Sequence, residues 1–132
     1  MSTQTIAIAS DHAGLALKDA VKKEIESLGF SVNDLGPHDT QSVDYPDYAN
    51  MLCEWVKKND GAKGVLICGS GIGMSIAANR HKAIRAALCQ SGLMAKLSRQ
   101  HNDANVLCMG ERLIGIEVAK DCVKQFLTTE FE

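Results

Sequence analysis

The chain has 132 residues, a formal net charge of −2 and 45% hydrophobic residues. These values fit one globular domain with enough chain to bury a core, and they give no support for a nucleic-acid or anionic-membrane partner. No apolar stretch approaches the roughly 18 residues of a membrane span, and the N-terminus shows no signal-peptide pattern. We therefore expect a single cytoplasmic domain over residues 1–132.

Short apolar segments alternate with amphipathic segments along the whole chain. The predicted strands span residues 5–9, 30–35, 65–67, 84–88 and 105–109. The predicted helices span residues 15–28, 46–58, 75–78, 91–100 and 115–126. This alternation predicts an α/β fold, a three-layer α/β/α sandwich around a five-stranded parallel, Rossmann-like sheet.

Helical spacing predicts the side chains that face the core. Leu17, Val21, Ile25 and Leu28 share one face of the first helix, and Gly29 supplies its stop signal. Two further helices have such inward faces. Their members are Leu52, Trp55 and Val56 in one, and Ile116, Ala119, Val123 and Phe126 in the other.

The five cysteines are widely spaced, with no Cys-x-x-Cys pair: Cys53, Cys68, Cys89, Cys108 and Cys122. We expect all except Cys68 to be small buried hydrophobes in a reducing compartment. No Cys/His spacing resembles a zinc site, so we expect no metal and no cofactor.

Polar clusters follow four of the predicted strands. They are Asp11-His12, Asp44, Cys68 to Gly73, and Gly110-Glu111-Arg112. Ligands of open parallel sheets bind at the carboxyl ends of the strands, so these clusters predict a shared site. His101 and Asn102 follow a helix instead, and we expect them at the opposite edge or facing a neighbouring subunit.

Ordinary roles are also open for several of these residues. Asp11 is a favoured helix N-cap residue, and His101 and Arg112 are residue types that commonly lie on the protein surface. We expect His38 and His81 to be solvated loop residues.

The segment from Cys68 to Gly73 has three glycines in five positions and opens onto a helix N-terminus. Glycines let the backbone turn sharply and approach a ligand, and the free N–H groups of a helix start favour negative charge. A thiol in that field is expected to ionise readily. The segment therefore predicts a reactive Cys68 beside an anion-binding loop.

Known phosphate loops do not fit this segment. A nucleotide-binding P-loop needs Lys-Ser/Thr after its last glycine, where Met74-Ser75 stand, and the dinucleotide fingerprint would need glycine at position 74. A cysteine phosphatase would need an arginine there too, which leaves phosphatase chemistry a weak alternative. A non-catalytic sugar-phosphate or nucleotide-binding module is a second alternative. A thiolate beside backbone donors suits proton abstraction next to a carbonyl.

Four motifs carry a family resemblance that spans nearly the whole chain in order. They are Ser10-Asp11-His12-Ala13-Gly14, Asp44-Tyr45-Pro46, the segment from Cys68 to Asn79, and the segment from Arg99 to Leu107. Together they resemble the ribose-5-phosphate isomerase B family, which also includes galactose-6-phosphate and allose-6-phosphate isomerases. The resemblance implies a metal-free aldose–ketose isomerase that interconverts ribose 5-phosphate and ribulose 5-phosphate, or a six-carbon sugar phosphate. It implies a homodimer with shared active sites, or a tetramer.

The resemblance also implies a role for each matching residue. Cys68 matches the base that moves the proton between C1 and C2, and His101, supplied by the partner subunit, matches the acid that opens the ring. Ser70 matches a residue that assists ring opening. The expected substrate ligands are Gly69, Ser70, Gly71, Ile72 and Gly73 for the enediolate, Asp11 and Asn102 for sugar hydroxyls, and His12 and Arg112 for the phosphate.

Position 74 indicates the branch of the family, and the C-terminal segment departs from the family pattern. One branch uses a glutamate on the loop as base, but Met74 stands at that position, which places the chain in the thiol branch. Family members usually carry a basic C-terminal tail that reaches the partner's phosphate, and residues up to Glu132 contain no such arginines. Without such a tail, phosphate affinity would depend on His12 and Arg112 alone.

Overall fold

All five strands of the structure lie in one parallel sheet. The computed structural model describes residues 4–38 and 43–132. The strands are β1 (Thr5–Ser10), β2 (Ser31–Asp34), β3 (Lys63–Cys68), β4 (Ala86–Leu88) and β5 (Val106–Gly110), in the spatial order β2-β1-β3-β5-β4. The helices are the short 3-10 helix η1 (His12–Gly14), α1 (Leu15–Ser27), α2 (Tyr45–Lys58), α3 (Ile72–Asn79), α4 (Gly92–Asn102) and α5 (Ile116–Thr128). The predicted α/β sandwich with a parallel five-stranded sheet is confirmed.

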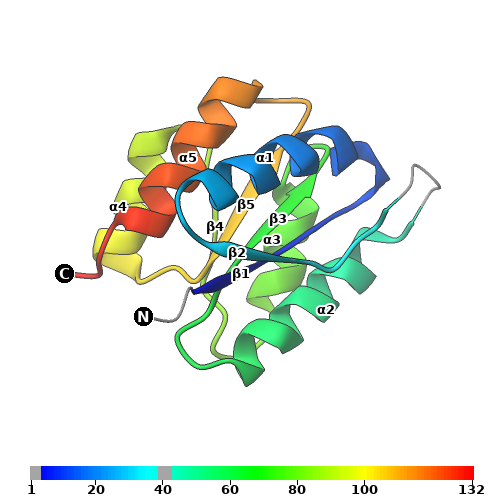
Figure 1. The fold of residues 1–132 in the computed structure, drawn as a ribbon. Helices are drawn as coiled ribbons and strands as arrows, with labels where there is room; N and C mark the ends of the chain where they lie inside the picture. The colour runs from blue at the N-terminus through cyan, green and yellow to red at the C-terminus, as the bar shows by residue number, and fades with distance from the viewer. Residues whose placement is uncertain (1–3, 39–42) are drawn as a thin grey trace.

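The helices cover the two faces of the sheet. Helices α1, α4 and α5 pack together on one face, and α2 and α3 pack on the other (Figure 1). This division follows from the strand order, because right-handed crossovers that run in opposite directions across the sheet lie on opposite faces. The crossovers from β1 to β2 and from β4 to β5 run one way, and those from β2 to β3 and from β3 to β4 run the other. The edge strand β4 carries α3 before it and α4 after it.

A hydrophobic core fills the space on each side of the sheet, and alternation along the strands feeds both. In β3, Val65 and Ile67 point into one core, whereas Leu66 and Cys68 belong to the other. Every residue of this strand from Gly64 onward is buried. A strand buried on both faces has a continuous apolar sequence, as β3 does.

The helix positions predicted to face inward are mostly confirmed. Leu17, Val21 and Ile25 are buried in α1, and Gly29 follows the helix with a φ of 95°. Leu28 and Trp55 are only partly buried. The prediction for Ile116 is wrong, because its side chain is 52% exposed. Side chains tilt toward the N-terminus of a helix, so the side chain of Ile116, the first residue of α5, extends beyond the N-terminal end of the helix.

A buried lysine secures the chain that leaves β2. The ammonium of Lys18 is 2.8 Å from Asp34 Oδ1 and 2.5 Å from the carbonyl oxygen of Pro37, and Lys22 lies 2.8 Å from Asp34 Oδ2. Burial opposes the charged carboxylate, but these two lysines and the N–H of Gly36 outweigh it and lower the pKa of Asp34 to about 2. The network fixes the start of the segment that leads from β2 toward the cleft described below.

Candidate active site

A cleft of about 400 Å³ opens at the carboxyl ends of the central strands β1 and β3 and of β5. It is lined by Asp11, His12, Ala13, Tyr45, Cys68, Gly69, Ser70, Gly73, Arg112 and Leu113. Three of the four polar clusters predicted at strand ends therefore meet here. Of the fourth, Asp44 immediately precedes Tyr45, at the start of α2.

Cys68 is the last residue of β3, and its side chain is 6% exposed. The N–H of Gly71 points back to it and donates a hydrogen bond to Sγ over 3.1 Å. Gly71 has a φ of 81°, a left-handed conformation that is natural only for glycine. The glycine loop thus directs a backbone donor at the sulfur.

Helix α3 begins at Ile72, three residues earlier than predicted, so the loop is shorter than the sequence indicated. Ser70 Oγ accepts a hydrogen bond from the N–H of Ile72 over 3.1 Å. Gly69, Ser70 and Gly73 line the cleft, but Gly71 and Ile72 do not. The N–H groups of Gly71 and Ile72 both donate within the loop.

Asp11 and His12 follow β1 directly. Asp11 is the N-cap of η1, and its Oδ1 accepts a hydrogen bond from the N–H of Gly14 over 3.0 Å, so the ordinary role open to this residue is present. His12 Nδ1 accepts from the N–H of Val43 over 3.3 Å. A neutral imidazole held in this way carries its proton on Nε2, which leaves that nitrogen as a donor.

Arg112 closes the other side of the glycine loop. Its N–H donates to the carbonyl oxygen of Gly69 over 2.9 Å. Its guanidinium lies beside the same residue, since a Cβ on Gly69 would be 3.4 Å from Arg112 Nε. The side chain is mostly exposed, so its charge is available to a ligand in the cleft.

Tyr45 is a lining residue that our sequence interpretation did not assign to the site. A Cβ on Gly73 would lie 2.8 Å from the tyrosine ring, so the ring packs directly against this glycine. The Asp44-Tyr45-Pro46 motif was a signal for the family, but composition and periodicity do not reveal that α2 begins beside the loop. The sequence interpretation also did not assign Ala13 and Leu113, which line the same cleft.

Glu111 adds a further carboxyl group near the cleft. Its Oε2 is buried and has no hydrogen-bond partner in the described part of the chain. Burial raises the pKa of Glu111, and the charge of Asp11 raises it further. Asp11 therefore has an acidic neighbour that resists ionisation.

His101 and Asn102 lie at the opposite edge of the sheet. They form the last turn of α4, and both are exposed and absent from the lining of the cleft. A single chain therefore does not bring them together with Cys68. Of the loop histidines, His38 is exposed as predicted, but His81 is not fully solvated: its ring nitrogen lies 2.8 Å from Asn50 Oδ1, and its side chain is 16% exposed.

The five cysteines are all free and buried. Burial raises the pKa of Cys53 and of Cys89 to about 11. Within residues 4–38 and 43–132, no group of three or more His, Cys, Asp or Glu side chains could hold a metal ion. None of the helices described for these residues could cross a bilayer.

Fold and cleft together define a parallel α/β protein with a thiol beside a glycine-rich loop at the carboxyl ends of its strands. Residues 6–132 match the Ribose/Galactose Isomerase family. Ribose-5-phosphate isomerase B of Escherichia coli is 42% identical over 127 residues, covering 96% of this chain and 85% of that protein. The chain belongs to the ribose/galactose isomerase family.

Solved structures give the same result. Ribose 5-phosphate isomerase B from Anaplasma phagocytophilum superposes with a TM-score of 0.92 at 51% identity, covering 99% of this chain and 90% of that chain. The type B ribose 5-phosphate isomerase of Trypanosoma brucei superposes with a TM-score of 0.95 at 43% identity, covering 98% of this chain and 89% of that chain. The expected family and fold are confirmed.

Proposed function

We propose that this chain interconverts D-ribose 5-phosphate and D-ribulose 5-phosphate through an enediolate, in the non-oxidative branch of the pentose phosphate pathway. One observation carries the proposal: the Cys68 thiol and the loop of Gly69, Ser70 and Gly73 share a cleft with His12 and Arg112. Related proteins named as ribose-5-phosphate isomerases support this substrate. An isomerase of a six-carbon sugar phosphate is the alternative within the same family.

The substrate phosphate is assigned to His12 and Arg112. Nε2–H of His12 and the Arg112 guanidinium are donors, and a charge-assisted contact to phosphate is about twice as strong as a neutral hydrogen bond. Asp11 and a partner's Asn102 would bind sugar hydroxyls. The phosphate then lies at one end of the cleft and the reacting carbons at the other, beside Cys68.

The chemistry follows from the groups near Cys68. A partner's His101, with Ser70 or Asp11, moves the protons that open the furanose ring. The Cys68 thiolate takes the proton from C2, and the N–H groups of Gly69, Ser70 and Gly73 stabilise the oxyanion of the enediolate. The same thiol returns the proton to C1 while the hydroxyl proton on O2 passes to O1, so that the protein is neither oxidised nor reduced.

A homodimer would supply His101 and Asn102. Exposed apolar side chains gather on the two helices joined to the edge strand β4: Ile72 and Ile76 on α3, and Leu93, Met94 and Leu97 on α4. Apolar surface of this kind marks interaction sites. Ile72 immediately follows the catalytic loop, and His101 is one turn beyond Leu97, so a two-fold contact across these helices could bring each His101 to the other chain's loop.

Complementation tests the shared site. Cys68→Ala and His101→Ala homodimers should each be inactive. Mixing the two variants and letting their subunits exchange should restore about a quarter of the wild-type activity, because about half of the dimers are then heterodimers and each heterodimer has one of its two sites intact. Separate sites within each chain would give no recovery. Native mass spectrometry, which resolves the mass difference between the two variants, confirms that subunits are exchanged, and sedimentation analysis distinguishes a dimer from a tetramer.

The substrate is tested by comparing kcat/KM on ribose 5-phosphate and allose 6-phosphate. A higher value on ribose 5-phosphate supports the proposal, and a higher value on allose 6-phosphate supports the six-carbon alternative. Tight binding of both without turnover would indicate a binding module, and release of inorganic phosphate would indicate a phosphatase. Turnover should be unchanged by EDTA, since every proposed step uses a side chain or backbone N–H.

The five free cysteines support a reducing, cytoplasmic location.

A further inference from the structure

A second cavity lies at the amino ends of the strands, at the edge of the sheet away from the active-site cleft. Its volume is about 430 Å³, and it is formed by the end of α2, the start of β3, the segment before β4 and the end of α4. Its charged lining residues are Lys57, Asp60, Lys63, Arg85, Arg99 and Asp103. Four cations and two carboxylates therefore line the cavity, and two further carboxylates lie near it: Glu54 is 3.2 Å from Lys57 Nζ, and Glu130 is close to Lys63.

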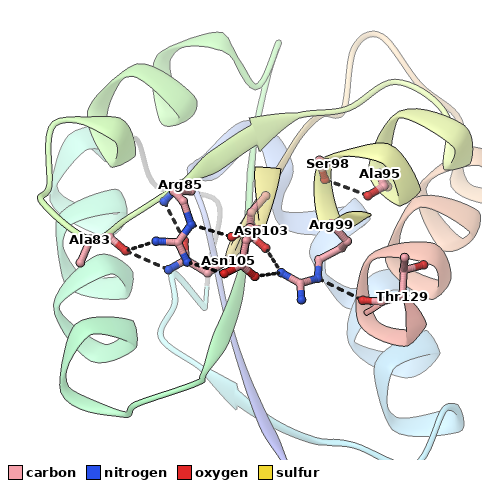
Figure 2. Close-up of polar contacts among 9 residues, drawn as sticks. Ala83, Arg85, Ala95, Ser98, Arg99, Asp103, Asn105 and Thr129 are labelled. Atoms are coloured by element: carbon pink, nitrogen blue, oxygen red, sulfur yellow. Dashed lines mark hydrogen bonds and ion pairs between the residues drawn. The ribbon is translucent and has the colours of Figure 1, made fainter. Parts of the chain in front are cut away.

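Arg99 is the most buried of these cations, with an exposed fraction of 6%. Its Nε donates to the carbonyl oxygen of Thr129 over 3.1 Å, and its Nη1 donates to Asp103 Oδ1 over 2.9 Å and to the carbonyl oxygen of Ala104. The third nitrogen, Nη2, points away from α4 and from these partners (Figure 2). The guanidinium is thus fixed in position, and no residue in the described part of the chain accepts a hydrogen bond from Nη2.

Asp103 does not neutralise this group alone, because two arginines share it. Its Oδ2 lies 3.4 Å from Nη2 of Arg85, while its Oδ1 bonds to Arg99. Arg85 is also held by the carbonyl oxygen of Asp103, which accepts from Nε over 2.6 Å. One carboxylate between two guanidinium groups leaves net positive charge on that side of the cavity (Figure 2).

Lys63 lies on the adjoining wall, at the first position of β3. Its ammonium forms no hydrogen bond or ion pair with the residues described for this chain, although it is half-buried. Burial lowers the pKa of Lys63 and the nearby charge of Arg99 lowers it further, while the carboxylates of Glu130 and Asp103 oppose this shift. Two cations that repel each other across a cavity are both stabilised by an anion between them.

We infer that this cavity binds a small phosphate-bearing anion, held between Arg99 and Arg85 on one wall and Lys63 on the other. A guanidinium with a fixed orientation and a lysine ammonium are the usual partners of phosphate oxygens. The volume admits a phosphate or diphosphate group with a small substituent. None of its lining residues lines the active-site cleft of the same chain.

Titration with pyrophosphate, followed by amide NMR, tests the site directly. The Arg112→Gln variant is used as the background, so that binding in the active-site cleft is weakened. Pyrophosphate should shift the amide signals of Gly61, Ala62 and Lys63, which line the second cavity. No saturable shift of these signals would overturn the inference, whatever the enzymatic activity of the protein.

Charge substitutions in the same background assign the effect to Lys63. Lys63→Gln should weaken binding about tenfold, the loss expected for one charged hydrogen bond. The control Lys58→Gln removes the same charge from an exposed residue outside the cavity, and it should leave the affinity unchanged. Equal losses in both variants would mean nonspecific attraction and would contradict the proposed site. Neutral glutamine suits a position where burial already disfavours charge, and unchanged NMR dispersion checks the fold.

Asp60→Asn supplies a change of opposite sign. Within the described residues, Asp60 is the carboxylate of this cavity that contacts no arginine, and its negative charge repels a bound anion. Removing that charge should tighten pyrophosphate binding several-fold. Lys63→Arg, which keeps a positive charge at position 63, should bind pyrophosphate as tightly as the unsubstituted residue. Weaker binding by Asp60→Asn would contradict an anion site and would instead fit a cation held by Asp60.

Discussion

The N–H of Gly71 lies 3.1 Å from Sγ of Cys68 and donates a hydrogen bond to it. The contact depends on the left-handed conformation of Gly71, which turns the chain back toward the strand it has just left. The same turn starts α3 at Ile72, so the sulfur, the loop amides and the helix start are fixed together. The chemistry assigned to the cleft depends on this local geometry.

Gly71→Ala should destabilise the protein and reduce turnover. A Cβ at this position would lie 2.5 Å from Leu88 Cδ1 and 2.9 Å from the backbone carbon of Met109, and the residue would also be strained at a φ of 81°. Clash and strain together predict a loss of about 2 to 4 kcal/mol in the free energy of unfolding, measured by urea denaturation.

Gly29→Ala is the matched control for this substitution. Gly29 has a φ of 95° but nothing within 4 Å of its Cβ position, so alanine there encounters the backbone strain without the clash. It should cost about 1 kcal/mol and leave kcat unchanged. Equal effects of the two variants on stability and kcat would show that the packing around Gly71 has no special role.

Arg112→Gln should raise KM for ribose 5-phosphate more than it lowers kcat. The guanidinium lies beside Gly69 and is assigned to the phosphate, which does not change during the reaction. Loss of one charged contact predicts an increase in KM of about tenfold or more. Arg80→Gln, an exposed arginine outside the cleft, is the control. A fall in kcat with an unchanged KM would place Arg112 at the reacting carbons instead.

Asp34→Asn should remove a pH-dependent part of the stability. The folded pKa of Asp34 is about 2, below its ordinary value of 3.8, so ionised Asp34 stabilises the fold above that value. This contribution is lost as the pH falls toward 2, and with solvent screening it is on the order of 1 to 2 kcal/mol. Urea unfolding of both proteins between pH 2 and pH 7 should give free-energy curves that converge at the acid end. Parallel curves would contradict the role of the Lys18–Asp34–Lys22 network.

The fold was predictable from the sequence because its strands are short, apolar and separated by clear helical patterns. The central site was predictable as well, since the ends of parallel strands must meet at one edge. The spatial order of β4 and β5 does not follow from such patterns. Contacts between distant segments were equally hidden: the donation from Val43 to His12 joins a loop to the end of β1, and Tyr45 reaches Gly73 from α2.

Charged groups were the least predictable part. Lys63 lies in β3, Arg85 in the segment before β4 and Arg99 in α4, and no local pattern indicates that they line one cavity. The early start of α3 also changed the site, because it engages the N–H groups of Gly71 and Ile72 within the loop. Both features depend on three-dimensional packing.

The most direct test of the proposed mechanism is kcat/KM of Cys68→Ala on ribose 5-phosphate. Cys53→Ala is the control, because it removes an equally buried thiol whose pKa burial raises to about 11. Both variants should keep the fold, judged by circular dichroism and thermal unfolding. We predict that Cys53→Ala retains nearly full activity and that Cys68→Ala loses about a hundred- to ten-thousand-fold, the usual contribution of a general base. Near wild-type turnover by folded Cys68→Ala would contradict the assignment of Cys68 as the base.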